Sequence, residues 1–94
     1  MQKFGYYRKS GELFLQNLSL KKLVDHYETP TFVYDSNLIK NSFYMLKKIM
    51  DPLNGKIHFA VKSNDNLGII KYINSLGAGA DIVSIGELKR CLKV

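Results

Sequence analysis

Two hydrophobic patterns alternate along this chain: short runs in which every second residue is apolar, and longer stretches in which apolar residues recur every three or four positions. The first pattern predicts strands and the second predicts helices. The clearest predicted strand covers residues 57–62, and others cover residues 31–34 and 79–83. The first of these carries Ile57, Phe59 and Val61 on one face and His58, Ala60 and Lys62 on the other. A shorter strand-like core follows the glycine turn at Gly11.

The predicted helices begin at residues that can cap them. Ser19 precedes an apolar stripe over residues 20–27, and Asp35 or Ser36 precedes a longer stripe that ends before Asp51 and Pro52. The run 64–66 reads as a turn and cap for a helix that stops at Gly77, and Ser84 opens another helix. Residues 57–94 therefore read as strand, helix, strand, helix with short connections.

This order predicts where two polar side chains lie. A strand, a crossover helix and a second strand with short connections should form parallel, adjacent strands with a right-handed crossover. Lys62 and Asp81 would then lie at or near the carboxyl ends of neighbouring strands. In α/β sheets and barrels this is the edge at which active sites are built.

Lys62 is the residue most indicative of chemistry. A lysine amine held in a lined, partly desolvated pocket can attack an aldehyde and form a Schiff base, and the small Ala60 leaves room beside it. The strand pattern alone, however, also fits an ordinary exposed lysine at a strand end. Both interpretations stay open on the pattern.

Three runs resemble diaminopimelate decarboxylase, a family of pyridoxal-phosphate enzymes that make L-lysine. They are residues 59–64 (FAVKSN), 76–84 (LGAGADIVS) and 86–90 (GELKR), and residues 28–35 (ETPTFVYD) resemble the strand that opens the barrel of the same family. The resemblance covers residues 19–94. Arginine, ornithine and carboxynorspermidine decarboxylases are related alternatives.

The resemblance implies an α/β fold, the amino-terminal portion of a (β/α)8 barrel, with residues 29–94 forming its first βα units and residues 1–28 associating with a β-domain. It implies pyridoxal 5'-phosphate as cofactor, a small amino-acid substrate, a homodimer with active sites at the subunit interface, and a cytoplasmic location. Lys62 would be the catalytic lysine that binds the cofactor. Asp81, Ser84 and Glu87 would be further cofactor-binding residues.

Each of these three residues also has a structural interpretation. Asp81 could be an acid paired inside the barrel. Ser84 and Glu87 form the Ser-x-x-Glu pattern of a capping box, which satisfies the first backbone donors of a helix and would explain both residues. Ile85 stands where many family members have glycine, and Asp65 stands where proline is frequent, which should loosen the turn. His58 lies about 13 Å before Lys62 at 3.3 Å per residue, too far to serve the same atom.

A whole barrel needs about 250 residues, and this chain has 94. We therefore expect it to be a truncated piece, inactive alone and prone to non-specific association through unpaired strand edges. A non-catalytic remnant that binds cofactor or a partner is the alternative from a different functional class.

Composition adds exclusions. The net charge of +6 comes from scattered lysines without a basic block, so nucleic-acid binding is not predicted. No apolar run approaches the roughly 20 residues of a membrane span. No Cys or His residues have ligand spacing, so no metal site is predicted. The single cysteine, Cys91, fits a half-buried structural thiol in a helix.

Overall fold

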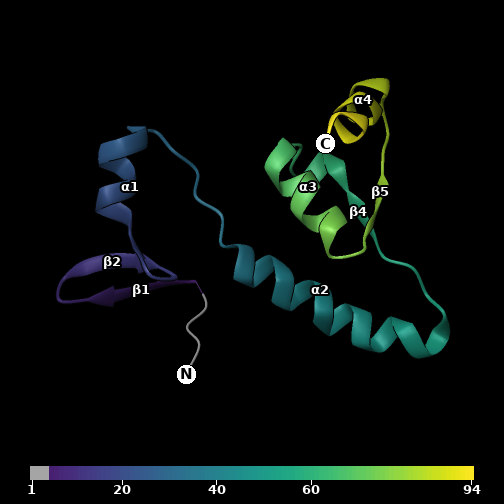
Figure 1. Ribbon diagram of the computed structural model, residues 1–94, viewed down its shortest axis with the longest axis horizontal. Coiled ribbons are helices and arrows are strands. Elements are labelled where there is room, and N and C mark those ends of the chain that lie inside the picture. The colour runs from purple at the N-terminus through teal and green to yellow at the C-terminus, as the bar shows by residue number, and fades with distance from the viewer. Residues whose placement is uncertain (1–4) are drawn as a thin grey trace. The chain divides into compact units, whose positions relative to one another are not determined.

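The computed structural model describes residues 5–94, which divide into two compact units with the boundary between Leu38 and Ile39. Figure 1 traces the elements in chain order. No helix of the described residues is long and apolar enough to cross a membrane. The division expected at residue 28, between a β-domain segment and a barrel, stays a prediction.

The first unit contains an antiparallel sheet of three strands and one helix. Strands β1 (Tyr6–Lys9), β2 (Glu12–Leu15) and β3 (Leu18–Ser19) pair in the order β1-β2-β3. Ser10 and Gly11 join the first two strands, both with positive φ (53° and 82°), as a tight two-residue hairpin turn requires. The strand expected after Gly11 is confirmed as β2, whereas β1 and β3 were not predicted.

Helix α1 (Leu20–Tyr27) follows the sheet directly. Ser19 is its N-cap, and its side chain accepts a hydrogen bond from the Lys22 N–H, as the sequence predicts. The helix ends at Glu28, whose φ of 65° breaks the helical conformation before Thr29 and Pro30. Leu20, Leu23 and Val24 of its apolar stripe line a cavity of about 230 Å³ together with Tyr6, Leu13, Thr31 and Val33.

The prediction of a strand over residues 31–34 is wrong. These residues have no regular secondary structure, and Phe32 is 87% exposed. Within the described residues they pair with no strand. The two other predicted strands, over residues 57–62 and 79–83, pair with each other in a two-stranded sheet.

Asp35 organises a polar junction within the first unit. Its buried carboxylate accepts hydrogen bonds from the N–H of Gly5 at 3.0 Å, from Gln16 Nε2 at 2.8 Å and from the N–H of Asn37 at 2.8 Å. The last bond caps the start of α2 (Ser36–Met50), so Asp35 is the capping residue of the two that the sequence left open. Burial raises the pKa of Asp35, but the hydrogen bonds from Gln16, Gly5 and Asn37 outweigh it and lower the pKa below 3.8.

Replacing Asp35 by asparagine is expected to reduce the free energy of unfolding at pH 7 by about 1 to 3 kcal/mol, because three donors lose a charged acceptor. A folded-state pKa below the unfolded value means that the stabilisation is present above that value, 3.8, and is lost as pH falls through the folded pKa. Denaturant titrations at pH 7 and pH 3 measure both effects. The asparagine variant should show a smaller loss between these pH values than the wild type, and equal losses would contradict the assignment.

The second unit contains most of α2, a parallel pair of strands and two further helices. Strand β4 (His58–Ala60) pairs with β5 (Gly79–Asp81), and α3 (Leu67–Ser75) connects them as the crossover (Figure 1). The parallel, adjacent arrangement is confirmed, but both strands are shorter than predicted. After β4 the chain turns into the 3-10 segment η2 (Val61–Ser63), and α4 (Ile85–Lys93) follows β5.

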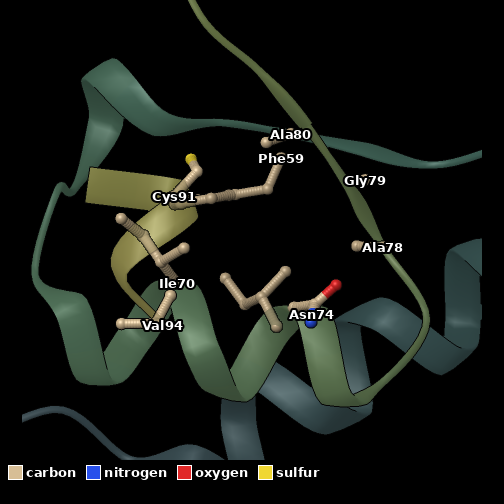
Figure 2. A pocket seen from close by; sticks show the side chains of 9 residues that line it. Phe59, Ile70, Asn74, Ala78, Gly79, Ala80, Cys91 and Val94 are labelled. Carbon is tan, nitrogen blue, oxygen red and sulfur yellow. The ribbon is translucent and has the colours of Figure 1, made fainter. Parts of the chain in front are cut away.

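The core of the second unit lies between one face of the strands and helices α3 and α4. Val61 is completely buried, and Ile70 and Ala78 are each 5% exposed. Figure 2 shows Phe59 of β4, Ile70 of α3 and Cys91 of α4 around a cavity of about 120 Å³. The half-buried state predicted for Cys91 is confirmed. The cavity lies on the face of β4 that carries Phe59, between the strands and the helices, and not on the face that carries Ala60.

Candidate functional site

The backbone around Lys62 is fixed while its side chain is free. Strand β4 ends at Ala60, and Val61, fully buried, anchors the turn that carries Lys62. The N–H of Asn64 donates to the Val61 carbonyl at 3.0 Å and closes that turn. The strand predicted over residues 57–62 ends at Ala60, so Lys62 lies in the turn that follows the strand and not in the strand itself.

The pocket expected around the Lys62 amine is not formed by the described residues. The Lys62 side chain is exposed in this chain. The physical reason is that β4 has one neighbour, β5, so a single strand end stands beside the lysine and the opposite side is open. The exposed amine is therefore available to a ligand but not desolvated by residues 5–94.

Asp81 lies at the corresponding end of the neighbouring strand. It is the last residue of β5 and pairs with Ala60, so these residues share a face of the sheet at the ordinary strand spacing of about 4.8 Å. Lys62 follows Ala60 by two residues, which brings an amine and a carboxylate to the same strand edge, as predicted. Within residues 5–94 Asp81 forms no ion pair, and its side chain is exposed. Such a carboxylate can balance the charge of a nearby protonated nitrogen.

His58 lies at the other end of β4. It pairs with Gly79, and a side chain added at Gly79 would come within 2.7 Å of the His58 ring. A larger residue at this position would therefore require the exposed His58 ring to move. His58 begins β4 and Lys62 lies in the turn after that strand, so the separation expected between them stays a prediction and His58 is not included in the candidate site.

Ser84 and Glu87 form the predicted cap at the start of α4. Ser84 Oγ accepts a hydrogen bond from the Glu87 N–H at 3.1 Å and donates to Glu87 Oε2 at 3.4 Å. Glu87 Oε1 accepts from the N–H of Val83 at 3.2 Å, one residue earlier than in the standard capping box. The Glu87 carboxylate is half-buried and holds the segment that follows Asp81. Ile85 is 72% exposed, so its bulk points outward and does not fill the loop.

The loop after Lys62 has a partner that sequence reasoning missed. Arg90 of α4 donates from Nε to the Asp65 carbonyl at 2.8 Å, and the same nitrogen lies 3.8 Å from Asp65 Oδ2. The turn expected to be loosened by Asp65 is thus held by a residue 25 positions further along. A single sequence carries no periodic or spacing signal that could have found this pair.

Asp81 therefore ends β5 and is followed by Ser84 and Glu87, while Lys62 follows β4 at the same edge of the sheet. Ser84 and Glu87 are hydrogen-bonded to each other, and Asp81 pairs with Ala60, two residues before Lys62. An exposed primary amine such as that of Lys62 can capture a carbonyl compound.

Comparison with known proteins places this edge in context. Residues 36–94 match the family described as "Pyridoxal-dependent decarboxylase, pyridoxal binding domain". The diaminopimelate decarboxylase of Aquifex aeolicus is 48% identical over 81 residues, which make up 85% of this chain and 19% of that protein. The diaminopimelate decarboxylase of Pseudomonas fluorescens is 38% identical over 92 residues, 98% of this chain and 22% of that protein.

A crystal structure of a protein from Aquifex aeolicus has the same fold. It matches with a TM-score of 0.87 and 43% sequence identity, covering 94% of this chain and 21% of that one. This chain therefore spans about a fifth of the length of the relatives it matches. The family match itself covers α2, both parallel strands, α3 and α4, including the turn that carries Lys62. The chain belongs to the pyridoxal-dependent decarboxylase family, and its residues 36–94 lie in the pyridoxal-binding domain.

Proposed function

We propose that this chain is the amino-terminal part of a (β/α)8 barrel enzyme that decarboxylates meso-2,6-diaminopimelate to L-lysine and carbon dioxide with pyridoxal 5'-phosphate. The observation that carries the proposal is the position of Lys62. Its amine is exposed at the carboxyl end of β4, next to the strand that ends in Asp81. The substrate is chosen because the relatives above carry the name diaminopimelate decarboxylase.

The residues at this edge fit the aldehyde end of the cofactor. An aldehyde reacts with a primary amine, and Lys62 offers one at an accessible position. Ala60, before it on the same face as Asp81, is small and leaves space. The Asp81 carboxylate supplies negative charge near the nitrogen, which favours its protonated form and orients it.

The cofactor, when bound, supplies an electron sink for the electron pair left behind as carbon dioxide departs. This chain supplies binding, orientation and charge. Lys62 holds the cofactor through Nζ, and the same nitrogen can carry a proton when it is not so engaged. Asp81 balances positive charge at that nitrogen. Glu87, through Val83 and Ser84, fixes the segment between Asp81 and α4 and adds a second carboxylate near it.

The proposal extends to the whole protein. Its substrate is a small amino acid, it acts as a cytoplasmic homodimer in lysine biosynthesis, and residues 1–28 associate with a β-domain. Sedimentation equilibrium of the full-length protein tests the dimer, because a mass of one subunit at micromolar concentration would contradict it.

The direct test of the activity is release of carbon dioxide by the full-length protein supplied with pyridoxal phosphate. The substrates are meso-diaminopimelate, L-ornithine, L-arginine and carboxynorspermidine at equal concentration. We expect release from diaminopimelate, with the other three at least 100-fold slower in kcat/KM. Preference for one of the other three would assign a sister decarboxylase. No release from any of them would leave a non-catalytic protein and overturn the proposed function.

Ser84 and Glu87 can be separated by two variants. Ser84→Ala should lower the free energy of unfolding by about 0.5 to 2 kcal/mol, because the N-cap acceptor is lost. Glu87→Gln keeps an oxygen for the Val83 N–H, so its melting temperature should stay close to wild type while kcat falls. Thermal melts and steady-state kinetics read the two effects. A Gln variant with wild-type stability and wild-type kcat would show that Glu87 serves the cap alone.

A further inference from the structure

Helix α4 contacts both chain segments that form the candidate site. At its first turn, Glu87 holds the Val83 N–H and the Ser84 hydroxyl, in the segment that follows Asp81. Three residues later, on the same side of the helix, Arg90 holds Asp65, in the segment that follows Lys62. Helix α4 is thus hydrogen-bonded to the chain just after the end of β5 and just after the end of β4.

Local hydrogen bonds hold the segment between Lys62 and α3. The Asn64 N–H donates to the Val61 carbonyl at 3.0 Å, and the Asn66 N–H donates to Asn64 Oδ1 at 3.1 Å. Asn66 then caps α3 by accepting from Gly68 and Ile69. The Asp65 carbonyl precedes the cap and takes no part in the helix, so Arg90 is its hydrogen-bonding partner.

Arg90 makes two interactions with Asp65 that differ in strength. The contact to Asp65 Oδ2 is long, at 3.8 Å, and joins side chains that are 43% and 67% exposed, so it contributes little. The bond to the Asp65 carbonyl is short, at 2.8 Å, and its donor is charged. The backbone contact is therefore the one that fixes the loop.

We propose that Arg90 is a positioning residue: by holding the Asp65 carbonyl, it sets the place of Lys62 relative to Asp81 and Glu87. This inference rests on the proposed function, in which Lys62 binds the cofactor. Arg90 acts through the loop and touches neither Lys62 nor any reacting group. Loss of its hydrogen bond lets the turn after β4 shift, and the Lys62 amine then meets the cofactor aldehyde in the correct geometry less often.

Four variants of the full-length protein test this role. Arg90→Met removes the donor and keeps the length of the apolar stem, while Arg90→Lys keeps a cationic donor. Asp65→Asn removes the charge pair and leaves the backbone carbonyl in place. Lys89→Met removes the neighbouring cation of α4, which is exposed and forms no ion pair within the described residues.

The first readout is the rate at which cofactor-free protein captures pyridoxal phosphate at Lys62, followed by absorbance and confirmed by borohydride reduction. Arg90→Met should capture about tenfold more slowly, since it loses one charge-assisted hydrogen bond. Arg90→Lys should recover part of the rate. Asp65→Asn and Lys89→Met should stay within about twofold of wild type. The second readout is steady-state kinetics, in which Arg90→Met should lower kcat with little change in KM.

Three outcomes would overturn the inference. Capture by Arg90→Met at the wild-type rate would show that the bond positions nothing. An Asp65→Asn defect as large as that of Arg90→Met would assign the effect to the charge pair. If Arg90→Met does not fold alone, it is refolded with methylguanidinium, and capture at the wild-type rate under that condition supports the inference. An Arg90→Lys protein that folds but captures no cofactor contradicts it. Wild-type protein that captures no cofactor at Lys62 would instead reject the proposed function.

Discussion

Alanine in place of Lys62 is expected to abolish covalent capture of pyridoxal phosphate and to lower kcat/KM for diaminopimelate by about three orders of magnitude or more. The reason is that Lys62 supplies the exposed amine at the strand edge beside Asp81. Stability should hardly change, because the Lys62 side chain is exposed, whereas its neighbour Val61 is fully buried. Absorbance of the purified protein and steady-state kinetics measure the two losses.

Lys71→Ala is the matched control for this variant. Lys71 is an exposed lysine on α3, away from the strand ends. Its removal should leave capture and turnover within about twofold of wild type. Retention of the cofactor absorbance in Lys62→Ala, or its loss in Lys71→Ala, would show that another amine holds the cofactor.

Ile70→Ala is expected to produce the largest loss of stability. Ile70 is 5% exposed on α3 and lines the cavity behind β4 together with Phe59 and Cys91 (Figure 2). Truncation of a buried isoleucine costs about 2 to 5 kcal/mol through lost transfer energy and an enlarged cavity. A chemical denaturation curve gives the change in the free energy of unfolding.

Ile85→Ala provides the comparison at an exposed site. Ile85 is 72% exposed at the first turn of α4, so the same chemical change should stay within about 0.5 kcal/mol. Equal effects of the two variants would mean that α3 does not pack on the strands as described. A large effect of Ile70→Ala on stability with little effect on cofactor capture per folded molecule would fit its place behind the strands.

Local signals predicted the caps and the strand edge well. Ser19, Asn66 and Ser84 each cap the helix that the sequence assigns to them, since a cap is decided within three or four residues of the helix start. The positions of Lys62 and Asp81 followed from one topological rule, the right-handed crossover between parallel strands. Both kinds of feature depend on short segments of chain.

Features that depend on distant partners could not be predicted. Residues 31–34 have the composition of a strand, but a strand needs a ladder partner, and the described residues provide none. The contacts of Asp35 with Gly5 and Gln16, and of Arg90 with Asp65, join residues 19 to 30 positions apart. Such pairs are set by tertiary packing, for which periodicity and spacing carry no information.

The predicted enclosure of the Lys62 side chain was wrong for a related reason. Alternation in residues 57–62 indicates which side chains share a face, and the small Ala60 suggested a lined space around Lys62. Enclosure, however, requires strands on both sides and elements above the strand ends. Residues 5–94 provide one neighbouring strand, and Lys62 is exposed among them.

The measurement that tests the central claim most directly is identification of the residue that binds the cofactor. The full-length protein is incubated with pyridoxal phosphate, reduced with borohydride and digested, and the modified peptide is sequenced by mass spectrometry. We expect the pyridoxyl group on Lys62 at near-stoichiometric yield, with the neighbouring lysines Lys56 and Lys71 unmodified. Labelling spread over many surface lysines, or confined to a lysine other than Lys62, would contradict the account.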